Sequence, residues 1–298
     1  MDHRHGRDLG VGFMTTARPA HETRRVSSGD TDIHYRLFGG GGGLPVIIAH
    51  GLSFFSWDWI EIAEALASER PVAAMDMRGF GESGWSPYHK YAPPAAAADI
   101  MAIMDQEGWD RAILAGHSFG GRVCLYATAT WPDRVAALAL IDFAPDLAPL
   151  GRKRVAQSIG GQPDLFDGVE AAMRYDGLDP AQAGADLRKR YEMFLQPVDG
   201  GYRLKRDLYH RDKFKAVLET GQRAPEKTDF WALLSNLTQP LTVIRAAESD
   251  LFAPETMDKV RQANSRAEVL EIAGTHDLAR TNPEGLVDAL RPLIARAE

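Results

Sequence analysis

Short apolar runs alternate with helical stretches along the first half of the chain. The strand candidates are Val46-Ile47-Ile48-Ala49 and residues 71–76, 112–115 and 135–141, and helical patterns lie at 57–67, 94–107 and after residue 118. Strands that alternate with helices are typical of a parallel sheet, because each connection crosses back over one face of that sheet. The pattern therefore predicts a doubly wound α/β fold.

The sheet extends on both sides of this central pattern. Residues 24–27 and 33–38 resemble an antiparallel strand pair at one edge, and further strands at 241–246 and 268–272 flank a helix at 255–263. A helix over residues 283–296 closes the chain. Together these segments predict an eight-stranded, mostly parallel sheet.

Between residues 145 and 235 the strand pattern stops. This segment is helical and holds 15 basic and 14 acidic residues, whereas the remainder of the chain holds 19 basic and 27 acidic residues. The change in charge balance indicates a separate helical subdomain inserted between two strands of one sheet. We predict a core of residues 21–144 and 236–298, a helical subdomain of residues 145–235, and a disordered N-terminal extension of residues 1–20, where Met14 is an alternative to Met1 as the native start.

Charge and composition exclude several classes of protein. The 34 Lys and Arg against 41 Asp and Glu give a net charge of −7, which argues against a nucleic-acid partner. Cys124 is the single cysteine, so an intrachain disulfide and a cysteine-built metal site are excluded. No apolar run approaches the length of a membrane span, and the first 20 residues lack the apolar stretch of a signal peptide. We expect a cytoplasmic protein that is not embedded in a membrane.

The strongest chemical signal is Gly116-His117-Ser118-Phe119-Gly120, a G-x-S-x-G between a predicted strand and a predicted helix. Glycines on both sides of the serine allow a sharp turn that presents the Ser118 hydroxyl at the carboxyl edge of the sheet. A neutral serine needs a neighbouring base and a carboxylate that orients this base. His276 follows the last predicted strand and Asp250 the strand before it, so both reach the same edge as Ser118.

The chain order of serine, aspartate and histidine, each after a separate strand, resembles the α/β-hydrolase superfamily. Further matches are His50-Gly51 after the third strand, Asp76-Met77-Arg78-Gly79-Phe80-Gly81-Glu82-Ser83 after the fourth, and Asn282-Pro283-Glu284 after the histidine. The resemblance covers residues 24–298. It implies the serine-nucleophile branch of esterases, lactonases and amidases, a helical cap between the sixth and seventh strands, and no metal or organic cofactor.

The same resemblance implies an oxyanion hole formed by the backbone N–H groups of Leu52 and Phe119. It also implies structural roles for three other side chains: His50 fixes the Leu52 loop, and Asp76 and Arg78 brace the turn after the fourth strand. His117 directly precedes the nucleophile, so we expect its side chain to point away from the pocket and to be a buried structural histidine.

Two carboxylates are candidates for the acid that orients His276. Asp250 occupies the commoner position in the family, and its 26-residue separation from His276 accommodates one helix and one strand. Asp142 ends the sixth strand, and some superfamily members take their acid from that position. We favour Asp250 and keep Asp142 as the alternative.

Residues that contact substrate are less clearly marked. Trp57 and Trp85 follow strands at the catalytic edge and are candidates for an apolar pocket, although Trp57 also begins a helix and fits the core equally well. Six cap arginines are candidates for binding a carboxylate group, although most such arginines are solvated: Arg152, Arg154, Arg174, Arg188, Arg190 and Arg211.

The leading hypothesis is hydrolysis of a small-molecule ester, lactone or amide through an acyl-enzyme on Ser118. Haloalkane dehalogenases and epoxide hydrolases fit poorly, because they use an aspartate where this chain has Ser118. Carbon–carbon bond hydrolases, cofactor-free perhydrolases and hydrolase-fold ligand receptors remain as alternatives. The sequence leaves the natural substrate and the oligomeric state open.

Overall fold

The central sheet of the protein has eight strands. The computed structural model describes residues 21–222 and 225–298, so the expected N-terminal extension and the choice between Met1 and Met14 lie outside the described residues. The strand order is β1-β2-β4-β3-β5-β6-β9-β10. The strands are β1 (Glu22–Ser28), β2 (Thr31–Phe38), β3 (Val46–Ala49), β4 (Val72–Met75), β5 (Ala112–His117), β6 (Val135–Ile141), β9 (Leu241–Ala246) and β10 (Glu268–Ile272).

The strands from β4 to β10 in this order pair in parallel, and the antiparallel pairings are those of β2 with β1 and with β4. The pairs β3–β5 and β5–β6 lie at the centre, which brings the ends of these strands together at one edge. The predicted eight-stranded, mostly parallel sheet is confirmed.

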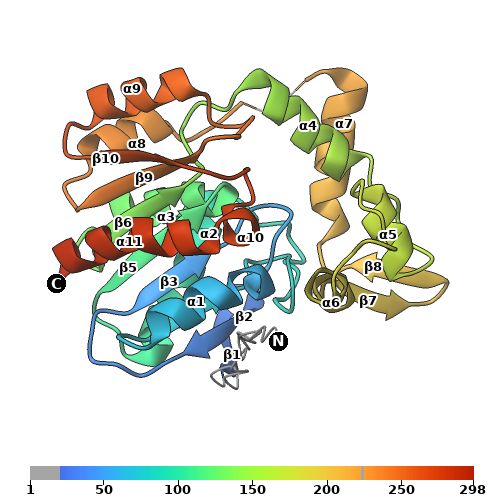
Figure 1. Cartoon of the computed structure of the whole chain (residues 1–298), viewed down its shortest axis with the longest axis horizontal. Helices are drawn as coiled ribbons and strands as arrows, with labels where there is room; N and C mark the ends of the chain where they lie inside the picture. The colour runs from blue at the N-terminus through green and yellow to red at the C-terminus, as the bar shows by residue number, and fades with distance from the viewer. Residues whose placement is uncertain (1–20, 223–224) are drawn as a thin grey trace, which may run out of the picture.

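Helices cover both faces of the sheet (Figure 1). One face packs against α1 (Ile60–Ala67) and α11 (Pro283–Ala297). The other packs against α2 (Pro93–Glu107), α3 (Phe119–Thr130), α8 (Phe230–Asn236) and α9 (Pro254–Ala263). The short helices η1 (Ser56–Trp59) and α10 (Leu278–Thr281) complete the core. Across the described residues, none of these helices combines the length and apolar character needed to cross a membrane.

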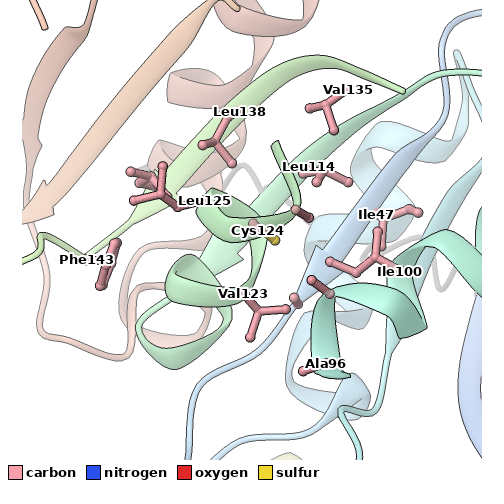
Figure 2. Packing of buried hydrophobic residues seen from close by; sticks show 14 of the residues in the cluster. Ile47, Ala96, Ile100, Leu114, Val123, Cys124, Leu125, Val135, Leu138 and Phe143 are labelled. Atoms are coloured by element: carbon pink, nitrogen blue, oxygen red, sulfur yellow. The ribbon is translucent and has the colours of Figure 1, made fainter. Parts of the chain in front are cut away.

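Successive side chains of a strand point to opposite faces of the sheet, which gives one packing layer on each face. Ile47 belongs to the cluster under α2 and α3, whereas its neighbour Ile48 belongs to the cluster under α1 and α11. Figure 2 shows the layer under α2 and α3, in which Cys124 of α3 lies near Leu114 of β5 and Leu138 of β6. Burial raises the pKa of the Cys124 thiol, so this cysteine serves the packing of the core.

An inserted unit, hereafter the insert, projects from the core between β6 and β9 (Figure 1). It consists of α4 (Pro149–Gly160), α5 (Val169–Tyr175), α6 (Ala185–Phe194), β7 (Leu195–Val198), β8 (Gly201–Leu204) and α7 (Leu208–Thr220). Its position after the sixth strand of the sheet is as expected. Its apolar cluster includes Phe166, Met173 and Phe194 and takes in Phe55 from the core.

Two features of the insert differ from the sequence-based prediction. The segment contains an antiparallel hairpin, β7–β8, where only helices were expected. Its strands have four residues each, too few to give an alternating pattern. The boundary at residue 235 was also wrong, because Phe230 and Leu234 of α8 are buried in the main core and α8 belongs to that core.

Candidate active site

Ser118 lies in the tight turn between β5 and α3. Its φ of 53° and ψ of −114° form a conformation that non-glycine residues seldom adopt. The flanking glycines allow this turn to pack closely. A Cβ on Gly116 would lie 2.5 Å from the carbonyl oxygen of Gly120, and one on Gly120 would overlap the carbonyl oxygen of Ala49. The expected strand–turn–helix geometry around the serine is confirmed.

A chain of two hydrogen bonds links Ser118, His276 and Asp142. Ser118 Oγ lies 3.1 Å from His276 Nε2, and His276 Nδ1 lies 2.6 Å from Asp142 Oδ2. The Asp142 side chain is fully buried, whereas His276 keeps 14% of its side-chain surface exposed. The imidazole therefore stands between a hydroxyl at the cavity wall and a carboxylate away from water.

The end of β9 and the loop after it support Asp142. The N–H of Ala246 donates to Asp142 Oδ1 over 2.9 Å, and the Ser249 hydroxyl donates to Oδ2 over 2.6 Å. Ser249 Oγ in turn accepts from the N–H groups of Leu251 and Phe252. Sequence reasoning missed Ser249, although it immediately precedes the favoured aspartate.

The structure corrects the predicted position of Asp250. This side chain forms a bidentate pair with Arg154 of α4, at 2.5 and 2.7 Å, and is 37% exposed. Asp142 comes directly after β6, whereas Asp250 lies four residues past the end of β9 and reaches the insert instead. The hydrogen bonds from Arg154 lower the pKa of Asp250. The alternative acid, Asp142, is the carboxylate that contacts His276.

Two backbone N–H groups beside Ser118 lack an acceptor within the described part of the chain, those of Leu52 and Phe119. The Phe119 N–H is free because it belongs to the first residue of α3. The Gly51–Leu52 peptide is fixed by His50, whose Nδ1 donates to the Gly51 carbonyl over 2.7 Å while its Nε2 accepts from Met77 N–H over 2.9 Å. His50 thus has the predicted structural contacts with this loop.

A buried arginine of the insert contacts the same loop. The guanidinium of Arg206 donates to the carbonyl of Leu52 over 3.2 Å and to the side chain of Gln162. The residue is 4% exposed, and burial lowers its pKa to about 10. No sequence signal marked this residue, because its partner lies 154 positions away.

His117 and the turn after β4 have the structural roles predicted for them. His117 is buried, and its Nε2 donates to the carbonyl of His276 over 2.8 Å, so it holds the backbone of that residue. Burial and the neighbouring His276 keep the pKa of His117 well below its usual value. Asp76 accepts from Ser56 N–H over 2.6 Å, and Arg78 forms a bidentate pair with buried Asp99.

Comparison with known proteins identifies the family of this chain. The family model for the alpha/beta hydrolase fold matches residues 45–279. The chain belongs to the α/β-hydrolase fold family. It is 26% identical to the 2-(acetamidomethylene)succinate hydrolase of Mesorhizobium japonicum over 91% of this chain and 95% of that one. A crystal structure of E-2-(acetamidomethylene)succinate hydrolase matches with a TM-score of 0.79 and 26% identity, covering 93% of this chain and 100% of that chain.

Two other relatives match over a part of their length. Lipase LipV of Mycobacterium tuberculosis is 34% identical, over 52% of this chain and 60% of the lipase. Esterase YbfF of Escherichia coli is 31% identical, over 49% of this chain and 53% of the esterase. This chain therefore spans less than two thirds of either protein. The named relatives are hydrolases, lipases and esterases, and the protein is a hydrolase of the α/β fold.

Two cavities of the hydrolase meet at Ser118 and share Leu52 and Val155 in their walls. The first, hereafter the polar arm, measures about 510 Å³; it contains His276 and many charged side chains, among them Arg154, Arg190, Glu248, Asp250, Asp277 and Arg280. The second, hereafter the apolar arm, measures about 460 Å³ and lies between the core and helices α4 and α7. Its apolar lining includes Phe119, Phe143, Leu147, Phe214, Val217 and Leu251.

The tryptophans proposed as substrate contacts line neither arm. Trp57 is partly buried between the core and the insert, with the Arg36 guanidinium 5.2 Å from its ring centre. Trp85 is likewise half-buried away from both arms. Of the six arginine candidates, Arg154 and Arg190 line the polar arm and Arg152 lines the apolar arm, whereas the other three line neither.

Within residues 21–222 and 225–298, no group of three or more His, Cys, Asp or Glu side chains is arranged to hold a metal ion. The groups near the Ser118 hydroxyl are the imidazole of His276, the carboxylate of Asp142 and two backbone N–H donors.

Proposed function

We propose that the protein is a serine hydrolase that cleaves a small-molecule carboxylic ester, or a related lactone or amide, through an acyl-enzyme on Ser118. The observation that carries this proposal is the hydrogen-bonded chain from Ser118 Oγ to His276 Nε2, at 3.1 Å, and from His276 Nδ1 to Asp142, at 2.6 Å. This arrangement has the parts of a nucleophile, a general base and an orienting acid.

In the first half-reaction, Ser118 Oγ attacks the carbonyl carbon of the substrate while His276 Nε2 accepts the hydroxyl proton. The buried Asp142 carboxylate stabilises the resulting imidazolium and holds its Nδ1 proton. The tetrahedral oxyanion receives hydrogen bonds from the N–H groups of Leu52 and Phe119. Each such donor stabilises the transition state by about 3 kcal/mol.

His276 then donates its proton to the leaving oxygen or nitrogen as the bond to the carbonyl carbon breaks. Water enters, gives a proton to His276 and attacks the acyl-enzyme, and His276 then returns this proton to Ser118 Oγ as the acid leaves. The insert acts as a cap in this scheme, because both arms that reach Ser118 are partly walled by its helices.

The relatives support an acyl-transfer reaction. Their names specify a lipase, an esterase and a hydrolase of 2-(acetamidomethylene)succinate, which by its name is an amide. Esters and amides are both cleaved by acyl transfer, and the low reactivity of amides makes esters the more sensitive probe.

The test is turnover of 4-nitrophenyl esters of graded chain length by the wild type and by Ser118→Ala, at neutral pH without added metal. We expect multiple turnover by the wild type and a loss of about 10⁴-fold or more in the variant. A matched control is Ser158→Ala, which alters a polar-arm serine that is not in the hydrogen-bonded chain. Turnover that survives Ser118→Ala, or its absence with every ester in the wild type, would contradict the proposal.

A further inference from the structure

The two arms differ in how their charges are balanced. In the polar arm, three arginines are each paired with a carboxylate. Arg154 lies 2.5 Å from Asp250, Arg190 lies 2.5 Å from Asp58, and Arg280 lies 2.7 Å from Asp277. The polar arm also contains Asp176 and Glu248, so its wall provides no excess of positive charge.

The apolar arm holds two cations whose charges are not balanced in this way. Arg152 of α4 and Lys213 of α7 line it, and neither forms an ion pair within the described residues. Both side chains are exposed, so they stand where the arm opens to solvent. The third cation, Arg122, is paired with Glu226.

Burial and nearby charges keep a neighbouring imidazole in its neutral form. His210 lines the apolar arm, is 5% exposed and has a pKa lowered to about 3, first by burial and then by the charges of Arg206, Lys213 and His89. A neutral His210 does not add to the local charge. Arg152 and Lys213 are therefore the groups available to an anion in this arm.

The position of His276 decides which part of a substrate enters each arm. His276 lines the polar arm and is absent from the wall of the apolar arm. Because His276 has to protonate the leaving group, that group lies in the polar arm. The acyl group then extends from Ser118 in the other direction, past Phe119 and Phe143 into the apolar arm.

We propose that the preferred substrates are esters whose acyl group is an apolar chain with an anionic far end, such as monoesters of dicarboxylic acids. This inference rests on the proposed function. The chain contacts the apolar lining, and its terminal carboxylate reaches Arg152 and Lys213 at the mouth. The carboxylate takes no part in the bond changes, so water cleaves the ester bond and the products are a dicarboxylate and a free alcohol.

The probes are 4-nitrophenyl monoesters of dicarboxylic acids, from adipate to sebacate, each compared with the 4-nitrophenyl ester of the monocarboxylic acid of equal chain length. The measured quantity is the ratio of kcat/KM for the charged ester to that for the neutral ester, after division by the spontaneous hydrolysis rates. We expect a ratio of about ten or more at low salt for the chain length that reaches the mouth, and a smaller ratio at high salt.

Variants test whether the two cations cause the preference for the charged ester. Arg152→Gln and Lys213→Gln should each lower the ratio about two- to fivefold, as for exposed ion pairs. Lys153→Gln and Lys215→Gln are matched controls, because they remove exposed cations of the same helices that do not line either arm, and they should leave the ratio unchanged. Because both esters are assayed on the same protein sample, a loss of folded protein cancels in the ratio.

An ester whose nitrophenol leaving group carries the carboxylate tests whether the acyl group, and not the leaving group, occupies the apolar arm. A preference for that ester over the acyl-side carboxylate would overturn the proposal, as would a ratio near one with both. In either case Ser118-dependent turnover of neutral esters would leave the proposed function standing. If no ester is hydrolysed, the proposed function fails and the inference fails with it.

Discussion

The core and the insert hold their polar side chains in different ways. In the core, Asp142 is fully buried and accepts hydrogen bonds from Ala246 N–H, Ser249 and His276. The insert contacts the core through ion pairs and through buried Arg206, and one of the ion pairs, Arg154–Asp250, is half-exposed. In our proposal the chemistry therefore depends on the core, whereas the insert governs access and substrate choice.

Replacing each of the two competing aspartates by asparagine gives the largest expected contrast. Asp142→Asn should lower kcat by about 10⁴-fold, because the amide favours the wrong histidine tautomer. Asp250→Asn should change kcat by less than about fivefold, because it weakens an exposed pair with Arg154. The measurement is kcat and KM on one 4-nitrophenyl ester. Equal losses in the two variants would break the distinction between the core and the insert.

Arg190 of the insert and Asp58 of the core form a buried ion pair, which tests how much a contact between the two units contributes to stability. Burial raises the pKa of Asp58, and Arg190 opposes this shift. Arg190→Met leaves a buried carboxylate without its partner and should lower the free energy of unfolding by about 3 kcal/mol.

The double variant, with Asp58→Asn added, should recover part of that loss because no unpaired charge remains. The check is the urea midpoint of the wild type, both single variants and the double variant. Additive losses would contradict the coupling of the two side chains.

Buried histidines make stability depend on pH. The folded-state pKa of His210 is about 3, against an unfolded value of 6.5. As the pH falls below 6.5, the unfolded chain binds a proton that the folded protein does not bind, so stability is lost. Between about pH 7 and pH 5 this residue accounts for about 2 kcal/mol.

His210→Phe should flatten the pH dependence, since the aromatic packing against Phe80 and Tyr91 is retained. The same pH profile in the wild type and in His210→Phe, measured by urea unfolding, would contradict this assignment. The lowered pKa values of His50 and His117 add to the dependence of stability on pH in both the wild type and His210→Phe.

The smallest expected effect concerns Ser249, which positions Asp142. Ser249→Ala should lower kcat by about tenfold with little change in KM, because the carboxylate loses one of its donors. Ser235→Ala is the matched control, since its hydroxyl bonds only to the backbone of α8. A loss of stability without a change in kcat would assign Ser249 a purely structural role.

The sequence predicted the parts of the fold that depend on local patterns. β5, the Ser118 turn and α3 are contiguous, so periodicity and two glycines were enough to place them. The hairpin β7–β8 escaped prediction because its strands are short and packed against residues from other helices.

For the candidate site, the sequence likewise predicted the serine and the histidine but not the acid. Ser118 and His276 follow strands that were predicted at the correct positions. In the structure Ser118 Oγ lies 3.1 Å from His276 Nε2. The acid could not be chosen from order and spacing, because Asp142 and Asp250 both follow strands at the same edge. The choice depends on turn length and on Arg154, which lies 96 residues from Asp250 in the chain. Long-range pairs of this kind have no signature in a single sequence.

The most direct test of the account is covalent labelling by a fluorophosphonate, in which Ser118 Oγ bonds to phosphorus and fluoride leaves. Intact-mass measurement with peptide mapping gives the site, and the time course gives the rate. The account predicts a single label on Ser118 that forms about a thousandfold more slowly in Asp142→Asn and at nearly the wild-type rate in Asp250→Asn. A label on another residue, or slow labelling only in Asp250→Asn, would contradict it.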